Sequence, residues 1–192
     1  PGEKISVSGS WGATATTTAA SDGSWRLKLK TPAAGGPFTI TVKGQNTLEL
    51  KNVLSGEVWL CSGQSNMGMT VNSVTNAQLE IAAANYPQIR LLSVNLTTAN
   101  EPQKECKVRG GQLCASNAVG AFTAAGYFFG RKLHQDLKVP IGLINSSWGG
   151  TCIEAWTSWD VQKDDPAMQA LKKSWDERDK TYTPEADQKQ FE

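Results

Sequence analysis

The residues best suited to chemistry lie in one segment, Gly56–Met67, where the apolar run Val58-Trp59-Leu60-Cys61 leads into Ser62-Gly63-Gln64-Ser65. A nucleophilic serine needs its hydroxyl at the carboxyl end of a strand and its own N–H free to bind the developing oxyanion. Gly63, two residues before Ser65, permits a sharp turn without a Cβ clash. The same spacing fits a serine that caps an ordinary helix, so both interpretations stay open on spacing alone.

A second segment, Ile144–Trp156, also follows an apolar strand and precedes a predicted helix. Its loop should open at the same sheet edge as Ser65, where open α/β sheets bind ligands. The pair Gly149-Gly150 lets the backbone approach a ligand, and Trp148 offers a flat face to a sugar ring. The alternative is a glycine-rich turn with Thr151 as a helix cap and the tryptophans in the core.

A serine esterase also requires a general base, and His134 is the only histidine. On a helix it falls off the apolar stripe, so we predict that it faces solvent, out of hydrogen-bond reach of Ser65. One histidine and four cysteines without a CxxC pair predict no metal site. The sequence thus offers a nucleophile without its base.

Alternation of apolar and polar residues predicts short strands in the first 55 residues, interrupted by turn-forming residues. These strands suggest an antiparallel sandwich or half of one. The apolar positions are Ile5 and Val7, then Trp25, Leu27 and Leu29, then Phe38, Ile40 and Val42, then Leu48 and Leu50. The predicted breaks are 21–23, 34–37 and 44–46.

After residue 55 the pattern becomes strand–helix–strand, which favours an α/β fold, an α/β/α sandwich. We expect strands buried on both faces at 58–61 and 141–144, a short strand at 89–94, and helices at 78–84, 120–138 and 167–178. The helix at 120–138 carries a stripe that should face the sheet: Phe122, Ala125, Phe129, Leu133 and Leu137.

The charges nearly balance, with 19 Lys and Arg against 18 Asp and Glu, so nothing indicates a nucleic acid or an anionic membrane as partner. No apolar run reaches the ~18 residues of a membrane span. Cys61 and Cys152 lie beside apolar stretches and are expected to be buried. Cys106 and Cys114 either close a small disulfide loop, typical of an oxidising compartment, or stay free.

Three segments, Gly56–Met67, Phe122–His134 and Pro140–Thr157, together resemble the sialate O-acetylesterase family of SGNH-type hydrolases. The strands around Asp22–Trp25 and Ala34–Val42 are similar to that family's leading β region. The resemblance therefore covers nearly all of the chain.

The resemblance implies a β-rich region at 1–55 and the first part of an SGNH-like three-layer α/β/α hydrolase domain, incomplete here, at 56–192. Residues 160–192 would be a charged helical insertion. It also implies a secreted or periplasmic protein that needs no cofactor and acts on an O-acetylated carbohydrate.

The resemblance identifies Ser65 as the nucleophile, with its N–H in the oxyanion hole. The residues expected at the oxyanion hole or the substrate are Gly63, Gln64, Asn66, Gly120, Trp148, Gly149, Gly150 and Thr151.

Two later blocks of the family are absent: a Trp-Tyr-Gln-Gly-Glu-Ser-like segment and an Asp-x-x-His-like segment that supplies the base. We therefore expect an internal fragment, inactive alone, whose remaining catalytic groups come from beyond residue 192 or from another chain. Two alternatives stay open: an acetyl esterase acting on xylan or a related plant polysaccharide, and a non-catalytic carbohydrate-binding protein.

Overall fold

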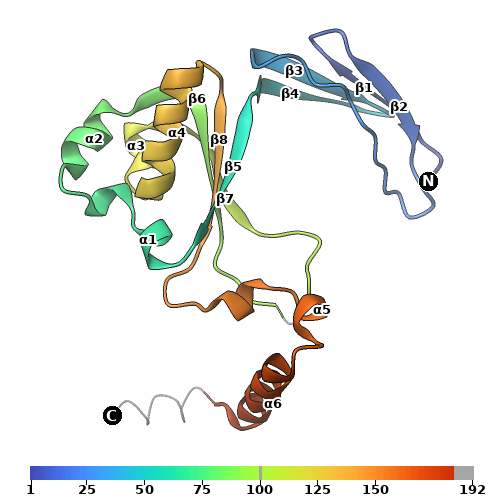
Figure 1. The fold of residues 1–192 in the computed structure, drawn as a ribbon. Coiled ribbons are helices and arrows are strands. Elements are labelled where there is room, and N and C mark those ends of the chain that lie inside the picture. Colours follow the sequence, from blue (N-terminus) through green and yellow to red (C-terminus); the bar gives the residue numbers. More distant parts are fainter. Residues whose placement is uncertain (100, 184–192) are drawn as a thin grey trace. The chain divides into compact units, whose positions relative to one another are not determined.

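A computed structural model describes residues 1–99 and 101–183 (Figure 1). Contacts divide the chain into two compact units. The first comprises residues 1–96 and 106–149, and the second comprises residues 97–105 together with the segment from Gly150 onward. Part of the expected insertion at 160–192 lies outside the described residues. Within those residues, no helix is long and apolar enough to cross a membrane.

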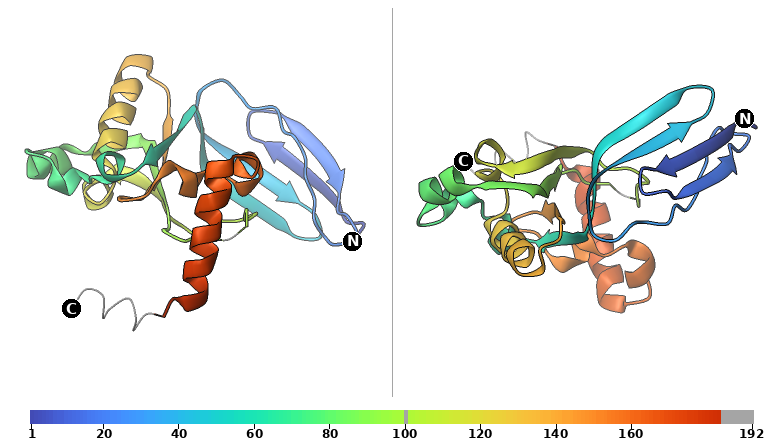
Figure 2. Two further views of the ribbon diagram at one scale, coloured as in Figure 1. Left: turned by 60° about the horizontal axis from the view of Figure 1, so that its bottom comes forward. Right: turned by 90° about the horizontal axis from the view of Figure 1, so that it is seen from above.

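The N-terminal strands form one antiparallel sheet in the order β2-β1-β3-β4 (Figure 2). Their bounds are β1 Lys4–Gly9, β2 Thr14–Thr18, β3 Gly35–Lys43 and β4 Thr47–Ser55. Ile5 and Val7 are buried, as the alternation predicted. The strand expected around Trp25–Leu29 is wrong: Leu27 and Leu29 pack against this small core, but their segment joins no ladder. The break expected at 34–37 is partly right: a bend ends at Ala34, but β3 already begins at Gly35, with a register shift between Gly35 and Phe38.

The second sheet has the order β5-β8-β6-β7. Strands β5 (Glu57–Gly63), β8 (Ile141–Ser147) and β6 (Asn85–Val94) run parallel, whereas β7 (Val108–Ala115) pairs antiparallel with β6. All three parallel strands therefore end at one edge of the sheet. The short helices are α1 (Ser65–Gly68), η1 (Val71–Ser73), α2 (Ala77–Ala83) and α3 (Ser116–Val119).

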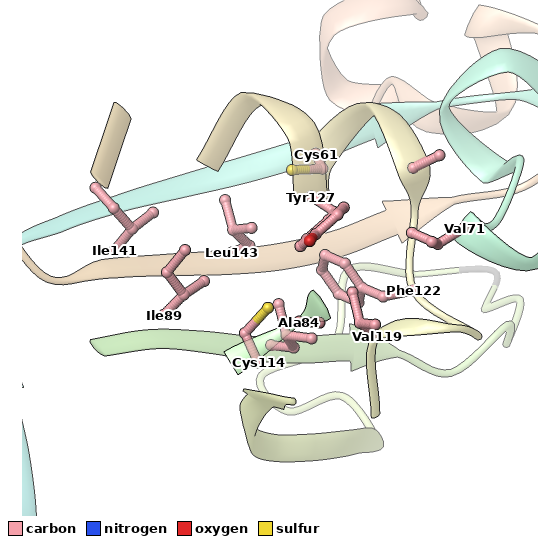
Figure 3. Packing of buried hydrophobic residues seen from close by; sticks show 12 residues of the cluster. Cys61, Val71, Ala84, Ile89, Cys114, Val119, Phe122, Tyr127, Ile141 and Leu143 are labelled. Carbon is pink, nitrogen blue, oxygen red and sulfur yellow. The ribbon is translucent and has the colours of Figure 1, made fainter. Parts of the chain in front are cut away.

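Helix α4 (Ala124–Leu137) lies against β8 and β6, over a core that includes Cys61, Tyr127 and Leu143 (Figure 3). The apolar stripe predicted for this helix is only partly right. Phe122 is buried before the helix begins, but Phe129 and Leu137 are 42% and 54% exposed.

The buried face of α4 carries Ala124, Gly126, Tyr127 and Gly130. A Cβ atom at Gly126 would lie 2.9 Å from Cys61 Sγ, and one at Gly130 would lie 2.6 Å from Leu143 Cδ1. The glycines therefore let the helix backbone approach the sheet where a larger side chain would collide with it.

Strand β5 is less buried than its apolar run predicted. Within the described residues it pairs only with β8, and Cys61 is its only buried residue. Trp59 packs edge-on against Phe129 of α4, with ring centroids 5.1 Å apart, while Val58 and Leu60 are 67% and 65% exposed. The expectation of burial on both faces holds better for β8, which has a strand on either side and buries Ile141 and Leu143.

All four cysteines are free. Cys61 and Cys114 are buried, whereas Cys106 and Cys152 are exposed. The disulfide weighed for Cys106 and Cys114 is therefore not formed, because Cys114 belongs to the core of the second sheet. The expected burial of Cys152 is also wrong.

The second unit contains η2 (Ile153–Trp156), α5 (Trp159–Gln162) and α6 (Pro166–Thr181). Helix α6 confirms the helix expected at 167–178. The Asp165 carboxylate accepts hydrogen bonds from the N–H groups of Ala167 and Met168, which satisfies donors at the helix start.

Candidate active site

Ser65 lies where β5 turns into α1, and its side chain is exposed. Strand β5 ends at Gly63, whose φ of +143° falls in a region that L side chains rarely adopt. The predicted sharp turn at Gly63 is therefore confirmed. The turn presents the Ser65 hydroxyl at the carboxyl end of a strand, as covalent catalysis by a serine requires.

The second predicted segment lies against this turn. Trp148 N donates a 2.9 Å hydrogen bond to the Gly63 carbonyl. A Cβ atom at Gly149 would lie 3.4 Å from Ser65 Oγ and 3.9 Å from Ser65 N. Because β5 and β8 are parallel neighbours, the loops that follow them meet at one edge, as the sequence predicted for Trp148 and Gly149.

Residues at the start of α4 form hydrogen bonds with the residues that follow Ser65. Ala124 N donates to the Met69 carbonyl at 2.8 Å, and the Thr123 hydroxyl lies 3.5 Å from Met67 Sδ. Thr123 is fully buried, and its hydroxyl also accepts a hydrogen bond from Gly126 N. The turn that carries Ser65 is thus fixed on one side by the β8 loop and on the other by α4.

Asn145 is a polar residue of this edge that sequence reasoning did not single out. It pairs with Cys61 of β5 and with Ser93 of β6, and its side-chain oxygen accepts a 2.8 Å hydrogen bond from the Ser147 hydroxyl. That bond leaves the amide N–H₂ free to donate elsewhere. The alternation of side-chain directions along a strand could have identified Asn145. Asn145 and Ser147 lie on the same face of β8 as the buried Ile141 and Leu143.

The other predicted site residues have different surroundings. Gln64 and Asn66 are exposed on either side of Ser65. Gly120 contacts Asn72: its carbonyl accepts from Asn72 N at 2.9 Å, and a Cβ atom there would lie 2.7 Å from Asn72 Oδ1. A role for these three residues in catalysis stays a prediction.

Gly150 and Thr151 belong to the second unit. The Thr151 hydroxyl accepts a 2.8 Å hydrogen bond from Trp156 Nε1. This bond fixes the Trp156 indole beside the turn that precedes η2. Trp148 and Gly149 therefore contact the Ser65 turn, and any role of Gly150 and Thr151 at the site stays a prediction.

His134 lies in the last turn of α4, eleven residues after Thr123, which is roughly 16 Å along a helix. Its Nδ1 is 2.8 Å from the Val139 carbonyl, and its ring packs edge-on near Tyr86. The expectation that it faces solvent is wrong, because the side chain is half-buried. Its placement at the far end of α4 agrees with the prediction that it is not the base.

The described residues hold no group of three His, Cys, Asp or Glu side chains that could bind a metal. Burial raises the pKa of the Cys61 thiol, four residues before Ser65, so this thiol is protonated at neutral pH. The Ser65 hydroxyl, by contrast, is exposed.

A family model described as carbohydrate esterase, sialic acid-specific acetylesterase, matches residues 55–181. The chain is 42% identical over 148 residues to the sialate O-acetylesterase of Rattus norvegicus and 40% identical over 158 residues to that of Homo sapiens. These alignments include 70% and 74% of this chain, but only 27% and 30% of the two relatives.

The crystal structure of a carbohydrate acetylesterase from Xanthomonas citri superimposes with a TM-score of 0.77 at 36% identity. That superposition covers 86% of this chain and 38% of the other. The fold is thus the SGNH-like α/β fold that the resemblance implied, in part. Because the family model spans the Ser65 turn, both loops beside it and α4, this chain belongs to the sialic acid-specific acetylesterase family of carbohydrate esterases.

Proposed function

We propose that this chain supplies the nucleophile of a carbohydrate O-acetylesterase that removes O-acetyl groups from sialic acid or a related acetylated sugar. The observation that carries the proposal is the exposed Ser65 hydroxyl at the end of β5, after Gly63 and beside Gly149. A helix cap would not need this constellation of turn and glycine loop.

In the proposed reaction, Ser65 Oγ attacks the acetyl carbonyl carbon while a base takes the hydroxyl proton. Backbone N–H groups, including that of Ser65, stabilise the tetrahedral oxyanion. The C–O bond to the sugar then breaks, and the base returns the proton to the departing sugar hydroxyl. Water hydrolyses the acetyl-enzyme to acetate and regenerates Ser65.

The base of this mechanism is a histidine outside these 192 residues. The position of His134 in the last turn of α4, with its Nδ1 beside the Val139 carbonyl, supports a base other than His134. The chain spans about a third or less of the curated relatives it matches, so whole-protein activity is part of the proposal. A secreted or periplasmic location stays a prediction.

Ser65→Ala in the whole protein should reduce acetate release by at least ~10³-fold, as for other covalent serine catalysts. The matched control is Ser62→Ala, an exposed serine near the end of β5, which should keep the wild-type rate. A serine-reactive fluorophosphonate should label the wild type and the control, but not Ser65→Ala. Near-normal turnover of Ser65→Ala would contradict the mechanism.

Acetylated sialic acid and acetylated xylan, compared as substrates, separate the two esterase classes. Faster acetate release from the sialic acid supports the proposal, and the reverse result favours a polysaccharide esterase. Sugar binding with no acetate release from either substrate would indicate a binding protein.

A further inference from the structure

A cavity of about 190 Å³ lies between strands β6 and β7 and the loop before α4. Ser93, Arg109, Gln112 and Phe122 contribute to its wall. Sites that enclose a whole drug-sized ligand measure ~300–1,000 Å³. This cavity therefore fits one end of a sugar, not all of it.

A β-bulge brings the polar side chains of β7 to this cavity. Leu91 pairs with Gln112 and Ser93 pairs with Arg109, so two steps along β6 correspond to three along β7. In a regular strand, residues three apart point to opposite faces of the sheet. The extra residue places Arg109 and Gln112 on the same face, the one that carries the core.

Two glycines make this bulge possible. Gly111 has a φ of +72°, which a residue with a side chain rarely adopts. A Cβ atom at Gly110 would lie 2.6 Å from the Leu91 carbonyl oxygen. The sequence Arg109-Gly110-Gly111-Gln112 thus builds the cavity wall, and bulges of this kind often aim side chains next to functional sites.

Arg109 has no ion-pair partner within residues 1–99 and 101–183; the ion pairs formed there involve other cations. Its guanidinium therefore presents a fork of N–H donors to the cavity. Such a fork matches the two oxygens of a carboxylate.

The cavity lies at the same level along the strands as the end of β5. One row of paired residues crosses the sheet near its carboxyl edge, from Cys61 through Asn145 and Ser93 to Arg109. Three strand spacings separate the ends of this row, or roughly 14 Å between the Cα atoms of Cys61 and Arg109. The Phe122 wall also contacts the segment after Ser65, since Val71 N donates to the Phe122 carbonyl at 3.0 Å.

We propose that this cavity is a subsite for the carboxylate of an acidic acetylated sugar, and that Arg109 selects acidic over neutral sugars. The Arg109 guanidinium binds the carboxylate, while Ser93 and Gln112 hydrogen-bond to neighbouring sugar groups. This inference rests on the proposed function and names the substrate class of the same site.

The first test uses the whole wild-type protein with O-acetylated sialic acid and its carboxyl methyl ester, which differ only in the charge. Loss of a charge-assisted hydrogen bond should lower kcat/KM for acetate release about tenfold with the methyl ester. Equal rates would overturn the subsite without affecting the role of Ser65.

The second test compares Arg109→Gln with Lys107→Gln, which removes an exposed cation two positions earlier, just before β7. Arg109→Gln should lower kcat/KM for the free acid about tenfold and leave the methyl ester unchanged, whereas Lys107→Gln should change neither. An unchanged preference in Arg109→Gln overturns the proposal. If Arg109→Gln misfolds and releases acetate slowly from both substrates, the comparison of the free acid with the methyl ester on the wild-type protein tests the subsite instead.

A binding measurement separates this inference from the proposed function. Unacetylated sialic acid carries no ester, so its dissociation constant, measured by calorimetry in a Ser65→Ala background, does not depend on catalysis. Adding Arg109→Gln should weaken this binding about tenfold. An unchanged dissociation constant overturns the subsite, while absence of acetate release from every substrate overturns the proposed function instead.

Discussion

Gly149 borders the hydroxyl of Ser65: a Cβ atom at residue 149 would lie 3.4 Å from Ser65 Oγ, in ordinary van der Waals contact. These residues are 84 positions apart in the chain, and the parallel pairing of β5 with β8 brings them together. The absence of one side chain keeps open the space beside the hydroxyl, through which the acetyl group approaches in the proposed reaction.

Gly149→Ala should therefore fold normally and lose activity. The added methyl group fits without collision, but it occupies space that an acetyl carbonyl needs, and kcat/KM should fall on the order of tenfold. Gly142→Ala, at the other end of β8, is the control and should retain the rate. The measurement is acetate release together with the urea midpoint; wild-type kcat/KM for Gly149→Ala would show that the acetyl group does not pass residue 149.

Gly130→Val should destabilise the fold more than Phe129→Ala, the reverse of what the apolar stripe predicted. Overpacking against Leu143 should cost about 1–3 kcal/mol in the free energy of unfolding. Phe129 is 42% exposed, so its truncation should cost less than the ~3–5 kcal/mol of a core phenylalanine. Denaturant titration of both variants gives the order, and a larger loss for Phe129→Ala would mean that the stripe is the true packing face.

Arg131 of α4 pairs with Glu80 of α2, and its guanidinium lies over the rings of Tyr127 and Phe128. Both charged side chains are about a quarter exposed. Arg131→Met should therefore lower the free energy of unfolding by about 1–2 kcal/mol.

The neighbouring ion pair of Lys132 with Asp136 provides the control for Arg131→Met. Both of its side chains are at least half exposed. Lys132→Met should change stability by less than ~0.5 kcal/mol. Equal urea midpoints for the two variants would show that the Glu80 pair adds nothing to stability.

Burial raises the pKa of the Cys114 thiol from 9.0 to about 11, against an opposing effect of the Arg131 charge. Between about pH 9 and pH 11 the unfolded chain loses this proton before the folded chain does. The free energy of unfolding contributed by the group is therefore complete below pH ~9 and falls as pH rises through that window.

The difference between wild type and Cys114→Ala isolates this contribution, because other groups titrate in both. Wild type should lose more stability than Cys114→Ala on going from about pH 9 to about pH 11. In native alkylation at neutral pH, exposed Cys106 should react and Cys114 should not. Parallel stability curves for the two proteins would contradict the raised pKa.

Strongly patterned elements could be predicted from the sequence. Helices α2 and α6 and strands β6 and β8 overlap their expected ranges, because each contains a periodic or apolar run. Strand β2 was missed because Thr14–Thr18 contains no large apolar residue. Strand β7 was missed because its glycines suggest a loop, whereas they form a bulge within a ladder.

The parts of the site formed by residues close together in the sequence, or by neighbouring parallel strands, could be predicted. The turn at Gly63 and Ser65 follows from adjacent residues, and the approach of Trp148 follows from the rule that parallel strands end at one edge. The hydrogen bond that orients Asn145 depends on side-chain directions that spacing does not reveal. The buried glycine face of α4 was hidden for a similar reason, since hydropathy gives no weight to a residue that packs through its backbone.

The bulge at Gly110 and Gly111 links the direction of the Arg109 side chain to the number of residues in β7. Deleting one of these glycines would restore the regular alternation of β7 and turn Arg109 to the opposite face of the sheet. Strands β5 and β8, whose carboxyl ends carry the Ser65 turn and the Gly149 loop, would keep their pairing. If Arg109 selects acidic sugars as proposed, a one-codon insertion or deletion at this position would change which sugars a descendant accepts while its reaction stayed the same.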